Sequence, residues 1–131
     1  MSAETLAGSL LRVGFWLPLA ICTYLAFAPS PPDAIAHMSD IVLHGFAFAY
    51  LTFALGLAYR SQRWWQTAAW MIAYGLAVEF VQSFEPQRSA ELKDLGVDCV
   101  GVALGLGALA LAGDRARTAA VRVTRVLARQ A

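Results

Sequence analysis

Four long apolar segments constrain the fold of this chain more than any other feature. A helix that crosses the hydrocarbon core of a bilayer needs about 20 mostly apolar residues, and residues 10–28, 41–59, 64–84 and 95–112 approach that length. Of the 131 residues, 59% are hydrophobic and only 15% are charged, whereas a soluble domain usually carries about 25% charged residues. We therefore predict one domain with an all-α fold, an integral membrane bundle of four transmembrane helices.

The first apolar segment has a second interpretation. Arg12, a short apolar stretch and the sequence Ala26-Phe27-Ala28 resemble a secretory signal peptide with its cleavage site. Glu4 in the leader and Pro29 directly after the site argue against cleavage. We therefore expect an uncleaved anchor helix, and under either interpretation the rest of the chain starts on the outer side.

The distribution of positive charge indicates the orientation in the membrane. Cytoplasmic loops carry an excess of Lys and Arg. With both ends of the chain inside, eight of the ten basic residues are cytoplasmic, and only Arg88 and Lys93 are external. The eight are Arg12, Arg60, Arg63, Arg115, Arg117, Arg122, Arg125 and Arg129. We therefore predict an N-in, C-in topology.

A basic tail follows the last apolar segment, so we divide the chain into a membrane domain, 1–113, and a tail, 114–131. The tail places arginines and apolar residues on opposite helical faces. These are Arg122, Arg125 and Arg129 against Val123, Val126 and Leu127. The pattern predicts a basic amphipathic helix on the anionic inner leaflet. A simple topological anchor is the alternative, and we do not expect a nucleic-acid site.

Several polar residues lie near the outer ends of the apolar segments. His44, Glu79, Gln82 and Asp98 lie inside these segments, and Arg88 and Asp94 lie in or beside the loop between the last two. At about 1.5 Å per residue, Glu79 and Asp98 would lie about 9 Å and 6 Å beneath the outer interface. An ionisable residue inside a membrane span is costly and is a functional candidate by default. We therefore predict that all six side chains converge on one outward-facing polar pocket.

Helical spacing puts these residues on faces that pack against other helices. One face carries Gly75, Glu79 and Gln82, and the other carries Asp94, Asp98, Gly101 and Gly105. Gly101 and Gly105 form a small-xxx-small pair, which allows a neighbouring backbone to approach closely. The structural alternative is that the acids only cap helices or fix their register by pairing with Arg88 and His44.

The mixture of side chains fits acid–base chemistry on an anionic ligand. His44 titrates near neutral pH, and we predict that His44 and Glu79 are catalytic. Arg88 could bind a phosphate or carboxylate bidentately. The predicted ligand-binding residues are Gln82, Arg88, Asp94 and Asp98. A divalent cation is an alternative, with Glu79, Asp94, Asp98 and His44 as its candidate ligands.

The ordered set of polar residues resembles the VanZ-like family of small bacterial membrane proteins. The pattern is Asp40-x3-His44, then Glu79-x2-Gln82-x-Phe84-x3-Arg88-x5-Asp94-x3-Asp98-x2-Gly101, and the resemblance covers residues 40–113. Ile41 stands where the family often has a basic residue, and Asp98 stands where it usually has Asn. The extra acid favours a cation site or a proton shuttle.

The resemblance implies a multi-pass protein of the bacterial inner membrane. The founding member of the family is associated with resistance to teicoplanin, a glycopeptide that acts on cell-wall precursors outside the membrane. We therefore expect the pocket to bind or act on a cell-envelope lipid or a lipid-linked anionic ligand, as a membrane hydrolase or transferase if it is an enzyme. The alternative is a non-catalytic accessory or assembly protein whose polar cluster serves helix packing or binds a membrane protein partner.

Overall fold

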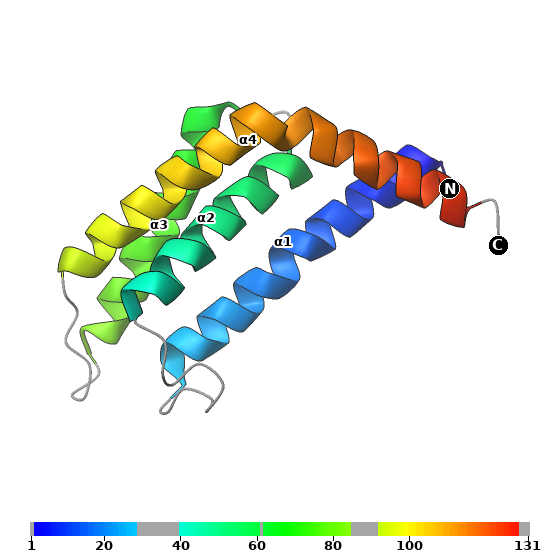
Figure 1. The fold of residues 1–131 in the computed structure, drawn as a ribbon. Helices are drawn as coiled ribbons and strands as arrows, with labels where there is room; N and C mark the ends of the chain where they lie inside the picture. The colour runs from blue at the N-terminus through cyan, green and yellow to red at the C-terminus, as the bar shows by residue number, and fades with distance from the viewer. Residues whose placement is uncertain (1, 29–39, 61, 85–91, 129–131) are drawn as a thin grey trace.

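The computed structural model describes residues 2–28, 40–60, 62–84 and 92–128, which form four helices. The helices are α1 (Ala3–Phe27), α2 (Asp40–Ala58), α3 (Trp64–Gln82) and α4 (Leu92–Leu127). Successive helices run in opposite directions (Figure 1). We call the end where α2 and α4 begin the acidic end, and the end where α2 finishes and α3 begins the basic end. The all-α prediction is confirmed.

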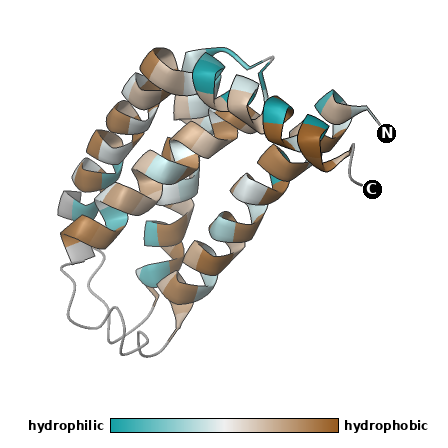
Figure 2. Cartoon of the chain, turned by 45° about the vertical axis from the view of Figure 1, so that its right-hand side comes forward, coloured by the Kyte–Doolittle hydropathy of each residue, from teal (hydrophilic) through white to brown (hydrophobic). Residues whose placement is uncertain are grey.

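Three of the four helices have the length and hydropathy of membrane spans: Ala3–Phe27, Ile41–Ala58 and Asp94–Leu127. Large apolar side chains such as Phe46 and Leu111 are 74% and 80% exposed, and apolar colour covers the outer faces of the helices (Figure 2). Helices that are apolar on all sides belong in a bilayer. α3 is not among these three spans: it has 19 residues, which include three tryptophans, two glutamines and Glu79.

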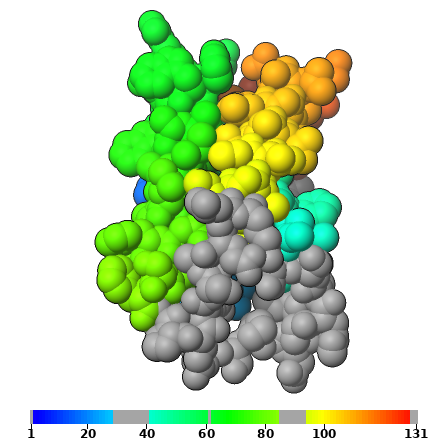
Figure 3. All heavy atoms as spheres, turned by 90° about the vertical axis from the view of Figure 1, so that its left-hand side faces the viewer, coloured from blue at the N-terminus to red at the C-terminus, as the bar shows by residue number. Residues whose placement is uncertain are grey.

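α2 lies at the centre of the bundle. Most buried residues of the hydrophobic core belong to α2, and the other helices contribute Phe15, Met71 and Val102. α3 also packs against α4, and the side chains of the two helices meet on the face shown in Figure 3. The core is therefore a set of apolar contacts around α2.

Two glycines bring the backbones of α2 and α4 together. A Cβ atom at Gly101 would lie 2.7 Å from the carbonyl oxygen of Gly45, and one at Gly105 would lie 2.5 Å from that of Ala49. Neither position has room for a side chain. The prediction of a close helix contact at this glycine pair is confirmed.

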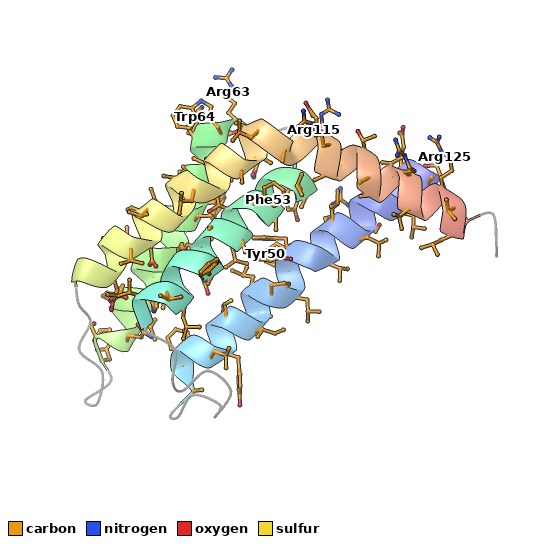
Figure 4. All side chains as sticks on the ribbon, in the orientation of Figure 1. Tyr50, Phe53, Arg63, Trp64, Arg115 and Arg125 are labelled. Carbon is orange, nitrogen blue, oxygen red and sulfur yellow. The ribbon has the colours of Figure 1, made fainter. Side chains whose placement is uncertain are left out.

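A tyrosine from α2 compensates for the proline inside α1. Pro18 has no N–H, so the carbonyl of Gly14 loses the helix hydrogen bond that it would normally accept. The hydroxyl of Tyr50, labelled in Figure 4, donates to this carbonyl at 2.8 Å. The contact satisfies the exposed backbone oxygen and also joins α1 to α2.

α4 has 36 residues and continues through Gly113 into the basic tail. It bends and crosses the basic end of the bundle towards the start of α1 (Figure 1). Arg117 Nη1 donates to the carbonyl of Leu57 at 2.7 Å, and Thr124 Oγ1 donates to that of Ala3 at 2.9 Å. The tail is therefore helical as far as Leu127 and packs on the bundle, while the division at residue 113 and the position of the tail on a leaflet stay predictions.

Candidate functional site

A histidine and an aspartate meet near the N-terminal ends of α2 and α4. His44 Nδ1 lies 3.1 Å from Asp98 Oδ1, and the Asp98 side chain is only 3% exposed, against 28% for His44. The close glycine contact explains the geometry, because Gly45 follows His44 and Gly101 lies one turn after Asp98. The backbone approach of α2 and α4 thus holds the imidazole against the carboxylate.

The third helix encloses the same carboxylate from another side. A Cβ atom at Gly75 would lie 3.0 Å from Asp98 Oδ2 and 3.2 Å from the ring of Phe48. Only the absence of a side chain at Gly75 lets α3 approach so closely. Asp98 is consequently buried among three helices.

Two more acids lie close to this pair. Glu79 is half-buried and lies within electrostatic range of His44, Asp94 and Asp98, and Asp94 is also half-buried and within range of His44. We call His44, Glu79, Asp94 and Asp98 the polar cluster. Glu79 and Asp94 lie in the neighbourhood of the His44–Asp98 contact at the acidic end, and the roles of all four residues in binding or catalysis stay predictions.

The other two residues that we expected in the pocket have different outcomes. Gln82 is buried, and its Nε2 donates to the carbonyl of Ala26 at 2.9 Å. The hydrogen bond of Gln82 therefore joins α3 to the end of α1 rather than reaching the polar cluster. Arg88 lies outside the described residues.

The described side chains offer no ligand set for a metal ion. Within residues 2–28, 40–60, 62–84 and 92–128, no three His, Cys, Asp or Glu side chains are grouped closely enough to hold one. The arrangement is better suited to orienting an imidazole. A carboxylate that accepts a hydrogen bond from Nδ1 leaves Nε2 of His44 available for proton transfer.

Sequence reasoning missed a pair of hydroxyl groups next to the polar cluster. Thr23 Oγ1 and the hydroxyl of Tyr74 lie 2.9 Å apart, which joins α1 to α3. Tyr74 is also within electrostatic range of Asp98. Threonine and tyrosine are common in apolar segments, so the positions of Thr23 and Tyr74 in the sequence did not predict that they would meet. The available hint was that Tyr74 precedes Gly75, a residue on the same helical face as Glu79.

The fold and the polar cluster define a small helical membrane protein with a buried histidine–carboxylate contact near one end of its bundle. The model of the VanZ/LLP1 family matches residues 16–113, which include the whole polar cluster. The chain therefore belongs to the VanZ-like family. No curated protein and no solved structure matched it.

Proposed function

We propose that the polar cluster binds the headgroup of a cell-envelope lipid, or a lipid-linked anionic ligand, on the outer side of the bacterial inner membrane. The observation that carries the proposal is the 3.1 Å contact between His44 and the buried Asp98. Apolar residues of similar volume often serve packing as well as or better than a buried ion pair. A costly acid buried inside a membrane protein therefore favours a role in binding or chemistry.

In this proposal His44 and Glu79 share proton transfer or ligand orientation, and Asp98 holds the imidazole of His44. Arg88 binds the anionic group, and Asp94 positions Arg88. A hydrolase or transferase that acts on a lipid headgroup is the enzymatic form of this function. A link to glycopeptide susceptibility would follow if the ligand is a cell-wall precursor.

The orientation is part of the proposal, because the polar cluster must face outward. Arg63, Arg115 and Arg125 lie on the same side of the bundle (Figure 4), and positive charge favours the cytoplasm. α3 serves as the fourth span, since its 19 residues extend about 28 Å and the hydrocarbon core is about 30 Å thick.

Reporter fusions test this orientation. A fluorescent protein that folds only in the cytoplasm should be bright when fused after Arg129, and alkaline phosphatase inserted at Ala90 should be active. The positive-inside distribution of eight arginines is the reason for this expectation. The reverse pattern would put the polar cluster on the cytoplasmic side and would end the proposal.

The alternative function, a non-catalytic accessory or assembly protein, has support of its own. Gln82 is engaged in joining α3 to α1. Two cavities lie along α1 and between α1, α2 and α3, and neither of them is lined by His44, Glu79 or Asp98. Under this alternative the polar cluster fixes helix packing or binds another membrane protein.

Lipids that copurify with the protein distinguish the two functions. Mass spectrometry of the purified wild type should find one envelope lipid enriched over its share of the bulk membrane. Arg88→Ala and Glu79→Gln should each reduce this enrichment about tenfold or more, since a charge-assisted contact contributes about 1.5–3 kcal/mol. Arg115→Ala, at the other end of the bundle, is the matched control.

The accessory alternative makes the opposite prediction. If the Arg88 and Glu79 variants bring down the same lipids as the wild type, the headgroup proposal fails. Glycopeptide susceptibility and envelope integrity of cells that carry His44→Ala or Glu79→Ala provide a second readout. Full activity of both folded variants would likewise count against a functional pocket.

A further inference from the structure

An apolar groove lies between α1, α2 and α3. It exists because α1 and α3 both pack on α2 but hardly touch each other. Its cavity of about 490 Å³ is lined mainly by large apolar and aromatic side chains, which include Phe15, Trp16, Leu19, Trp70, Met71 and Tyr74. This volume lies in the range of ligand pockets, about 300–1,000 Å³.

The groove is elongated along α1. A second cavity of about 600 Å³ continues from Trp16 and Leu19 along the same face of α1 to Ala28. The distance from Phe15 to Ala28 along the helix is about 20 Å, which exceeds half of the 30 Å thickness of the hydrocarbon core. A long apolar groove within a membrane span has the shape of a lipid acyl chain.

The end of the groove nearest the basic end is polar. Trp16 Nε1 donates to the hydroxyl of Tyr59 at 2.9 Å, and Arg12 Cζ lies 5.8 Å from the centre of the Tyr59 ring. Gln62 also lines the groove, and its buried Oε1 has no hydrogen-bond partner in the described part of the chain. A cation and an unsatisfied acceptor therefore both lie beside Tyr59, where the apolar surface ends.

We propose that this groove binds one acyl chain of an anionic glycerophospholipid from the leaflet at the basic end. The phosphate lies near Arg12, and a headgroup hydroxyl donates to Gln62 Oε1. Phosphatidylglycerol carries both groups. Phosphatidylcholine would instead bring its own cation close to Arg12 and has no hydrogen-bond donor for Gln62. The site is separate from the polar cluster and does not depend on the function proposed for it.

Tryptophan fluorescence tests the proposal, because Trp16 and Trp70 line the groove. A Trp64→Phe/Trp65→Phe background leaves these two as reporters in vesicles of phosphatidylcholine. Brominated phosphatidylglycerol should quench the fluorescence of Trp16 and Trp70 at about fivefold lower mole fraction than brominated phosphatidylcholine. One basic residue near a membrane surface favours an anionic lipid by about this factor. Arg12→Gln and Gln62→Leu should each reduce this preference, and Ala73→Phe, which fills the groove, should reduce quenching by both lipids.

Arg115→Gln is the matched control, because Arg115 is exposed near the same end but does not line the groove. It should leave the fivefold preference intact. Equal quenching by the two lipids in the background protein would overturn the proposal. An equal loss of preference in the Arg12 and Arg115 variants would also overturn it, because it would indicate a general attraction of anionic lipid to the basic end. A third contradicting result would be unchanged quenching in Ala73→Phe, provided that its circular dichroism spectrum shows the same helix content.

Discussion

Replacing Gly105 with valine should destabilise the protein by about 3 kcal/mol or more, because overpacking of this kind forces the backbone to move. The new Cβ would lie 2.5 Å from the carbonyl oxygen of Ala49 and 2.6 Å from Cβ of Thr52. Neither atom is the end of a flexible side chain, so α2 and α4 would have to separate. Unfolding in detergent micelles, followed by circular dichroism, measures the loss.

Gly107→Val provides the control for this prediction. Gly107 lies two residues further along α4, and a Cβ there meets nothing within 4 Å in the described structure. Valine also has a somewhat higher helix propensity than glycine, so stability should be unchanged or slightly higher. Equal losses in the two variants would mean that valine itself, rather than the α2–α4 contact, causes the effect.

The second large effect is expected at the histidine–aspartate contact. His44→Leu should cost about 3–5 kcal/mol, because breaking a buried pair leaves the other group without compensation. Asp98→Leu should cost less, since it removes the buried acid and leaves a partly exposed imidazole. The double variant should then be about as stable as Asp98→Leu alone, and a double-mutant cycle in micelles measures this coupling.

The same cycle separates a structural role from a functional one. Additive losses in the two single variants would show that the contact contributes nothing to folding. If the double leucine variant is stable but loses lipid enrichment and envelope activity, the polar pair serves function rather than packing. If it keeps both, the accessory alternative gains support.

The helices could be predicted from the sequence because long apolar segments leave few choices in a membrane. The end of α4 could not be predicted in this way. The composition becomes polar after Gly113, and we divided the chain there. A change in polarity marks a membrane boundary rather than the end of a helix, because the backbone hydrogen bonds of a helix form on both sides of that boundary. The structure accordingly continues α4 to Leu127.

The tail shows a second limit of hydropathy. The apolar residues of the tail, Val123, Val126 and Leu127, are each more than half exposed, and their contact with a leaflet stays a prediction. Close packing on α1 is made instead around Thr124, whose small side chain lets the helices approach. Hydropathy identified apolar residues and could not say whether a helix or a lipid covers them.

For the candidate site, position along the helices predicted which residues lie at the same end of the bundle, but a shared helical face did not predict which neighbour each side chain meets. His44 and Asp98 were predicted to share one level, and the structure puts them in contact. Gln82 shares a helical face with Glu79, yet its amide reaches Ala26 on α1, because two residues on one face can meet different neighbours. The apolar groove depends on how far α1 diverges from α3, which no local spacing encodes.

The contact between Thr124 and Ala3 joins residues separated by 121 positions. It can form only after residue 124 has left the ribosome, long after α1 has entered the membrane. The start of α1 is therefore fixed late, whereas its middle can already pack on α2 through Tyr50. The groove between α1, α2 and α3 is complete once α3 has packed on α2, so we expect it to take up lipid before residue 124 makes this last contact with α1.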